Sequence, residues 1–237
     1  MAAAERRHRG AVQDVGPLRI RLSARSALLL SLCGVSAYCT ILFMVRYWRT
    51  DVVRFGFLPW NLFLAWVPFV CALIISALSE RRHSWPLTVP LGVVWLLFLP
   101  NAPYLLTDLV HLGPVREAPF WFDVLLLASF AVNGLLLGFA ALAMVQQVVV
   151  RRFGPRWGWT LAFGALGLCG YGIYLGRFLR WNSWDALDSP GMLVRQVSTL
   201  TDPLSQPTAV VVSLLFGSLL VLCYLVTLTT ARVLDER

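Results

Sequence analysis

The chain has 237 residues, of which 58% are hydrophobic and only 14% are charged, and its mean hydropathy is +0.71. It carries 20 strongly basic residues, all of them arginine, and 12 acidic residues. A soluble domain usually has about a quarter charged residues and under half apolar residues, so this composition excludes an ordinary water-soluble globule. The arginines stand between apolar stretches rather than on a solvated face, so we expect them to bind no nucleic acid.

Six uncharged stretches of 20 to 29 residues predict six membrane-spanning helices. A helix needs about 20 apolar residues to cross about 30 Å of hydrocarbon. None of the stretches alternates polar with apolar residues, as a barrel strand would. We therefore predict an all-α polytopic membrane protein, a bundle of six transmembrane helices, with spans at about 26–45, 55–78, 84–107, 124–150, 157–176 and 205–231.

The first stretch is predicted to be a retained signal anchor, because its apolar core is too long for a cleaved signal peptide and no small-residue cleavage site follows. We expect a disordered basic tail at 1–24, a transmembrane domain at 25–232 and a short tail at 233–237. With the N-terminus inside, cytoplasmic segments hold thirteen arginines and the opposite side holds seven, which favours cytoplasmic termini. The excess of cytoplasmic arginines comes entirely from the six arginines of the N-terminal tail, because without them each side holds seven.

The third stretch ends in LPNAPYLLTDLVHL, residues 99–112. Pro100 and Pro103 each remove a backbone donor and disfavour helical geometry in the preceding residue. We therefore predict that this helix is broken or kinked at Asn101, while still at membrane depth. The freed carbonyl groups need partners, for which Asn101 and Tyr104 are candidates. Such backbone is tolerated only inside protein or beside a wet cavity, so a packed kink and a functional cavity both remain open.

Polar residues gather after the third and fifth spans and before the fourth, and the predicted topology brings them together at one extracytoplasmic rim. Opposite charges in this partly dry layer should pair, with Asp108 and either Arg177 or Arg180 as the leading pair. The candidates for a polar lock between helices or for ligand binding are Asn101, Tyr104, Asp108, His111, Asp123, Arg177, Arg180, Asn182 and Asp185.

Three interpretations of this rim remain open. It could be a structural lock of salt bridges and hydrogen bonds, or an anionic ligand site that uses the two arginines. A divalent metal site of Asp108, His111 and one further carboxylate is the third, but the D-x-x-H spacing lacks a third fixed ligand, and we predict no metal.

Two G-x-x-x-G pairs lie deeper in the predicted bundle, Gly134 with Gly138 and Gly172 with Gly176. Small residues let helix backbones approach closely. We therefore predict that spans four and five pack together through these glycines, with Asn133 hydrogen-bonding across the contact. In span two, Asn61 is a candidate for the same purpose.

Several functions are disfavoured by what the sequence lacks. No Asp, Glu, Arg or His stands in the middle of a span, which argues against a proton pump or voltage sensor. Nucleotide-binding, zinc-protease and serine-hydrolase motifs are absent from the sequence. All five cysteines lie inside apolar stretches and are predicted to be buried thiols. We expect no cofactor.

The strings LPNAPYLLTDLVHL (99–112) and YGIYLGRFLRWNSWD (171–185) resemble the signatures of a bacterial family of multi-pass membrane proteins known only as a domain of unknown function. The resemblance extends from about the first span to the last. It implies a bacterial integral membrane protein and implies no reaction, cofactor or catalytic residue.

The sequence therefore predicts a multi-pass protein of a bacterial plasma membrane whose molecular function is open. The leading hypothesis is a non-enzymatic protein with a structural polar lock at the rim. The first alternative is binding or translocation of a small anionic or lipidic ligand there. The second is a membrane enzyme on a lipid-linked substrate, with Asp108 or His111 as acid or base.

Overall fold

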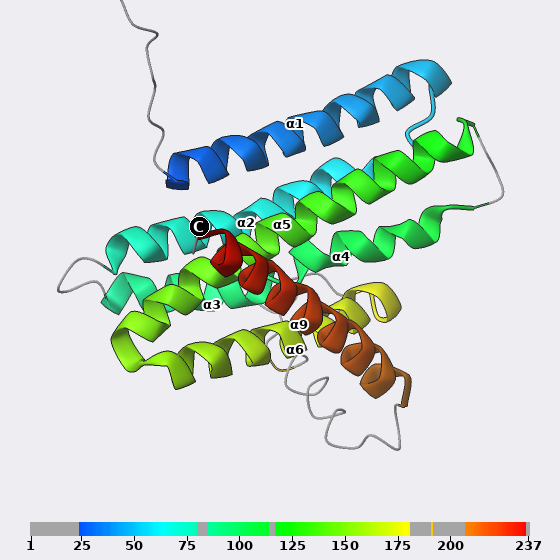
Figure 1. The fold of residues 1–237 in the computed structure, drawn as a ribbon. Coiled ribbons are helices and arrows are strands. Elements are labelled where there is room, and N and C mark those ends of the chain that lie inside the picture. The colour runs from blue at the N-terminus through cyan, green and yellow to red at the C-terminus, as the bar shows by residue number, and fades with distance from the viewer. Residues whose placement is uncertain (1–23, 80–84, 114–116, 181–190, 192–206, 236–237) are drawn as a thin grey trace, which may run out of the picture.

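The computed structural model of the protein describes residues 24–79, 85–113, 117–180, 191 and 207–235, and these residues form helices and no strand. The helices shown in Figure 1 are α1 (Ala24–Thr50), α2 (Phe57–Leu78), α3 (Trp85–Phe98), α4 (Asn101–Thr107), the 3₁₀-helix η1 (Asp108–His111), α5 (Phe120–Phe153), α6 (Pro155–Phe178) and α9 (Pro207–Asp235).

Six segments of the described chain are long and apolar enough to cross a membrane, and α3, α4 and η1 together make up the third. The predicted all-α bundle of six spans is therefore confirmed. Three helices are longer than their uncharged windows, because α1 continues to Thr50, α5 begins at Phe120 and α6 extends from Pro155 to Phe178. Charged residues at the margins of these windows are thus parts of the helices.

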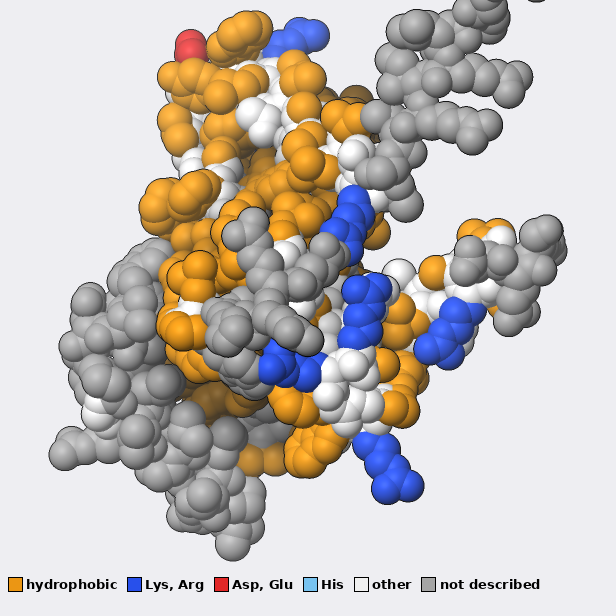
Figure 2. Space-filling view, turned by 90° about the vertical axis from the view of Figure 1, so that its left-hand side faces the viewer, with side chains coloured by type: hydrophobic (Ala, Val, Ile, Leu, Met, Phe, Trp, Pro, Cys, Tyr) orange, Lys and Arg blue, Asp and Glu red, His pale blue; other side chains and the backbone are white. Residues whose placement is uncertain are grey.

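The spans alternate in direction, so the bundle has two ends (Figure 1). At one, which we call the arginine end, α1 and α6 begin and α2, α5 and α9 finish. At the other, which we call the cavity end, α1, η1 and α6 finish and α2, α5 and α9 begin. Figure 2 views the molecule from the side on which α1 begins, and arginine side chains gather in the middle of that face.

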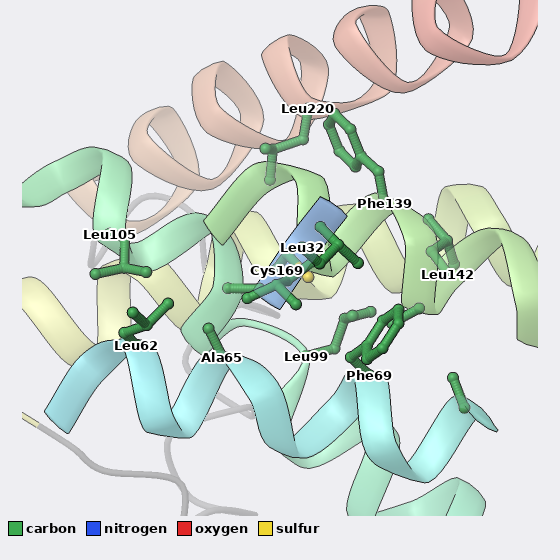
Figure 3. Packing of buried hydrophobic residues seen from close by; sticks show 14 of the residues in the cluster. Leu32, Leu62, Ala65, Phe69, Leu99, Leu105, Phe139, Leu142, Cys169 and Leu220 are labelled. Carbon is green, nitrogen blue, oxygen red and sulfur yellow. The ribbon is translucent and has the colours of Figure 1, made fainter. Parts of the chain in front are cut away.

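Helix α5 forms the centre of the bundle and packs against α1, α2, α4 and α6. Its side chains Leu126, Phe130 and Leu142 are fully buried. They belong to one core to which helices from α1 to α9 contribute, and Figure 3 shows part of it. The burial of one stripe on each helix, with apolar residues also facing outward, is the pattern expected in lipid rather than in water.

Two close contacts fix α6 between its neighbours. Gly154 has φ +92°, which a glycine adopts without a steric penalty, and Pro155 then opens α6, so α5 and α6 are joined by a very short turn. Further along α6, Gly170 lies against the carbonyl oxygen of Ser213 and 2.8 Å from the backbone nitrogen of Gly217, measured from where a Cβ would stand. Helix α9 therefore approaches α6 at backbone distance.

Large hydrophobic side chains cover much of the outer surface. Trp48, Leu214 and Val226 are examples of exposed apolar residues on α1 and α9. Among the described side chains that Figure 2 shows, hydrophobic ones predominate outside the arginines. A soluble protein rarely exposes apolar area on this scale, whereas a lipid-facing surface requires it.

Candidate functional site

The third span is broken between Leu99 and Pro100, one residue before the predicted position. Pro103 has no N–H for the Leu99 carbonyl, and the Ala102 N–H bonds to that carbonyl instead, at 3.2 Å. This leaves the Phe98 carbonyl free, and the side chain of Asn101 donates to it at 3.0 Å. Asn101 therefore satisfies a backbone group that the break exposes at membrane depth.

Glycines on the two neighbouring helices, α5 and α6, leave room for the residues at this break. The carbonyl oxygen of Ala102 fills the space where Gly134 would carry a side chain, and the Ala102 Cβ lies 2.9 Å from the corresponding position at Gly138. On α6, Pro100 lies 2.6 Å from the corresponding position at Gly172. The structure therefore differs from the predicted use of these glycines: they admit the broken third span, rather than joining α5 and α6 to each other.

Asn133, expected to bond between spans four and five, instead donates to the Ser36 hydroxyl of α1 at 2.8 Å. The indole N–H of Trp66 on α2 donates to the same hydroxyl at 3.1 Å. One serine thus joins three helices. The reason for the difference is rotational: Gly134 faces the third span, and Asn133, about 100° away from it around α5, faces α1.

Asp108 is the centre of the polar site at the cavity end, and only 1% of its side chain is exposed. One carboxylate oxygen accepts from Arg177 of α6 at 2.8 Å, and the other accepts from Asn61 of α2 at 3.1 Å. Arg177 also donates to the Thr107 hydroxyl, at 2.8 Å. The carboxylate therefore links the third span to both α2 and α6, and Arg177 is the partner it takes.

Two aromatic contacts lie next to the Asp108 carboxylate and its partners. The Arg177 guanidinium lies over the ring of Tyr104, 5.0 Å from its centroid, where a cation–π attraction holds it. His111 lies against Phe57 with ring centroids 4.7 Å apart, and its Nδ1 is 3.0 Å from the Asp108 carbonyl oxygen. His111 and Asp108 are thus neighbours, with 4.0 Å between His111 Nδ1 and the carboxylate.

A cavity of about 590 Å³ opens beside these residues. Cavities of this size are typical of sites for small molecules. It is lined by parts of α2, of the broken third span and of α6, whose ends converge at the cavity end of Figure 1. The polar groups at its shallow end include His111, Asp108 and Arg177, with Tyr104 and Asn101 further in.

Arg180 also lines the cavity and is exposed. No carboxylate within the described part of the chain pairs with it, since the ion pairs there involve Arg46, His111 and Arg177. Its backbone has φ +56°, in the left-handed region that glycine usually occupies after a helix. The end of α6 therefore presents a cation to the cavity.

Asp123, predicted to join this cluster, belongs to a second one. Its carboxylate accepts from Arg46 of α1 at 2.7 Å, and Glu117 accepts from the same guanidinium at 3.1 Å. Arg46 is only 2% exposed and also lies over Phe55, 4.5 Å from the ring centroid. This cluster ties α1 to the start of α5. Asp123 takes this partner because α1 continues past its uncharged window and carries Arg46 into the bundle.

The remaining candidates are placed in part. Gly176 lines the cavity. Asn182 and Asp185 lie outside the described residues. Among the described residues, no group of three His, Cys, Asp or Glu side chains could hold a metal ion.

Sequence reasoning missed Asn61 as a partner of Asp108 and Arg46 as a partner of Asp123. The position of Arg46 was recoverable from periodicity, since it follows the buried residues Leu32, Cys39 and Phe43 at spacings of a helical face. The pairing of Asn61 with Asp108 could not be predicted from the sequence, because contacts between distant helices leave no local pattern.

The fold and surface together define a polytopic helical membrane protein. The chain belongs to DUF1361, a family of proteins of unknown function, whose sequence profile matches residues 60–223. The match contains the break, Asp108, Arg177 and Arg180, and it leaves α1 outside. Comparisons with curated proteins and with solved structures found no significant match.

Proposed function

We propose that the cavity end of this protein is a binding site for an anionic group, a phosphate or a carboxylate, and that the protein works by binding rather than by catalysis. The observation that carries the proposal is Arg180, an exposed guanidinium that lines the cavity without a carboxylate partner in the described chain. A guanidinium fork suits both phosphate and carboxylate oxygens.

The balance of charge in the cavity supports an anion. The charged side chains of its described lining, apart from His111, are Asp108, Arg177 and Arg180. Asp108 and Arg177 already neutralise each other at 2.8 Å. Arg180 therefore gives the described lining an excess of one positive charge, which a singly charged anion would balance.

The hydrogen bonds of Asp108 support a structural lock as a second role of the same residues. Both carboxylate oxygens are occupied, by Asn61 and by Arg177. The lock holds α2, the third span and α6 around the cavity, and it keeps Arg177 at the wall. Lock and binding site are thus compatible, with Arg180 as the group left for the ligand.

No chemical step is assigned to this site. An acid or base needs an available proton site, whereas the Asp108 carboxylate is engaged on both oxygens. The further carboxylate expected at the rim, Asp123, pairs with Arg46 in the other cluster.

The proposal includes the orientation of the protein in a bacterial plasma membrane. By sequence position, thirteen arginines belong to the side of the arginine end and seven to the other side, which favours cytoplasmic termini. Among the described arginines, Arg151, Arg152 and Arg156 are exposed at the arginine end. The cavity then opens toward the extracytoplasmic side.

Thermal unfolding of the detergent-solubilised protein tests the binding proposal. The probes are inorganic phosphate and dihexanoyl-phosphatidylglycerol, a soluble phosphodiester. The lipid is titrated only up to concentrations at which it forms no micelles of its own. A ligand that binds the folded state raises its unfolding temperature. We expect at least one probe to do so for the wild type and for Arg156→Gln, and to do so much less for Arg180→Gln.

Arg156→Gln is the matched control, because Arg156 is an exposed arginine at the opposite end. Stabilisation by phosphate alone would indicate a site for a free anion, and stabilisation by the diester alone would indicate a head-group site. If neither probe stabilises the wild type, or if Arg180→Gln responds as the wild type does, the anion site is refuted.

A further inference from the structure

The cavity extends along the bundle over the depth of one membrane leaflet. On α6 its lining runs from Leu168 to Arg177, which is nine residues of helix or about 14 Å. Half of a hydrocarbon core about 30 Å thick is about 15 Å. A cavity built for a small soluble anion alone has no need of this depth.

The lining changes from polar to mainly apolar along that depth on two walls, the third span and α6. On the third span the order from the shallow end is His111, Asp108, Tyr104, Asn101, Leu97 and Val93. On α6 it is Arg180, Arg177, Leu175, Gly172, Tyr171 and Leu168. On α2 it runs from Phe57 through Asn61 to Leu64. The charged groups thus stand at the shallow end, and the deep end is mainly apolar, with Tyr171 as the one residue of its described lining that carries a hydroxyl.

Two side chains that line the deep end are also largely exposed. Val93 is 58% exposed and Leu168 is 48% exposed, although both line the cavity. They belong to α3 and α6, and each lies within a segment long and apolar enough to cross a membrane. A chain of methylene groups could therefore pass between the cavity and the surrounding lipid without crossing a polar barrier.

We propose that the occupant of this cavity is a single anionic phospholipid from the leaflet at the cavity end, with its phosphodiester at Arg180 and one acyl chain in the apolar deep half. The inference rests on the proposed anion site and names its ligand class. A phosphodiester carries one negative charge, which matches the one excess positive charge of the described cavity lining. The exposed side wall gives such a lipid a route from the bilayer.

The experiment compares two probes that share a head group, palmitoyl-oleoyl-phosphatidylglycerol and dihexanoyl-phosphatidylglycerol. Their binding to the detergent-purified protein is measured by native mass spectrometry for the first and by thermal shift for the second. Leu168→Trp fills the deep half and leaves the arginines in place. We expect it to weaken binding of the long-chain probe about tenfold, a change of about 1.4 kcal/mol, and to leave binding of the short-chain probe unchanged.

Leu222→Trp is the control for the size of the new side chain, because Leu222 is 62% exposed on α9 and does not line the cavity. This variant should bind both probes as the wild type does. Val93→Trp fills the deep half from the opposite wall and should reproduce the effect of Leu168→Trp, so the test survives if one of the two variants fails to fold.

The outcomes separate the two proposals. Unchanged long-chain binding in a folded Leu168→Trp or Val93→Trp variant overturns the acyl-chain inference and leaves the anion site standing. Unchanged binding of both probes in Arg180→Gln overturns the anion site and the lipid inference with it. Equal weakening of long-chain binding in Leu222→Trp would also overturn the inference, because the effect would then not come from the cavity.

Discussion

The carbonyl oxygen of Ala102 occupies the space in which any residue other than glycine at position 134 would carry its Cβ. This contact places the first turn after the break against the central helix α5. The Leu105 side chain lies 2.8 Å from the same Cβ position. The break is therefore fixed by close packing, and the cavity next to it is a built feature of the fold.

Gly134→Ala is expected to destabilise the protein. The added methyl group meets a backbone oxygen, which cannot rotate away as a side chain can, so α4 and α5 must separate. Overpacking of this kind costs about 1–3 kcal/mol, more than the helix propensity gained on replacing glycine by alanine. The measurement is the thermal unfolding temperature in detergent.

The matched control is Gly164→Ala on α6, where nothing lies within 4 Å of the added Cβ. That variant should be as stable as the wild type or slightly more stable, because alanine favours the helix. Equal stability of the two variants would show that the third span does not rest on α5 as described.

A double-mutant cycle on Asp108→Asn and Arg177→Gln measures the ion pair itself. Each single change leaves the opposite charge without its partner in a partly dry layer, and the second change then removes that charge as well. We expect a coupling energy of about 1–3 kcal/mol from the unfolding free energies of the four proteins. Combining Asp108→Asn with the distant change Arg156→Gln should give additive effects, and zero coupling between positions 108 and 177 would remove the lock.

Arg46→Met is expected to be among the most damaging single changes in α1. It leaves the buried carboxylate of Asp123 without its guanidinium, and breaking a buried pair from one side costs about 3–5 kcal/mol. The double change Arg46→Met with Asp123→Leu should recover part of the loss, as measured by thermal unfolding. The control is Arg49→Met, at an exposed position three residues further along α1, and it should leave the unfolding temperature unchanged. An Arg46→Met protein as stable as the wild type would show that the Arg46–Asp123 pair does not anchor α1.

The orientation can be checked by labelling cysteines in intact cells. In a cysteine-free background, Val110→Cys at the cavity end should react with a membrane-impermeant maleimide. Arg152→Cys at the arginine end should react only after the cells are permeabilised. The reverse pattern would place the termini outside, and labelling of both in intact cells would contradict the topology.

The number and type of the spans followed from composition, because uncharged length is a local property of the chain. The break at Pro100 and Pro103 was predictable for the same reason, since proline acts on its immediate neighbours. The pairing of Asp108 with Arg177 could be predicted as one of two alternatives, because the predicted topology placed few opposite charges at the same depth.

Rotational orientation of the helices was not predictable in this way. Gly134 and Gly172 predicted a close helix–helix contact but did not identify the partner helix, because a small residue is equally suited to any neighbour. Asp123 was assigned to the wrong cluster because the window analysis ended α1 before Arg46. Both differences come from contacts between segments that are distant in sequence.

Arg180→Gly separates the backbone role of this position from its charge. With φ +56°, Arg180 holds a conformation that glycine adopts without steric penalty, so the change should raise stability by up to about 1 kcal/mol or leave it unchanged. The same change removes the cation from the cavity, and binding of dihexanoyl-phosphatidylglycerol should weaken about tenfold. Thermal unfolding with and without the probe measures both quantities.

Asp51→Gly is the control for this prediction, because Asp51 has a similar φ of +52° and does not line the cavity. It should shift stability in the same direction as Arg180→Gly and leave binding of the probe unchanged. A stable Arg180→Gly protein that binds the probe as tightly as the wild type would mean that the guanidinium does not hold the anion.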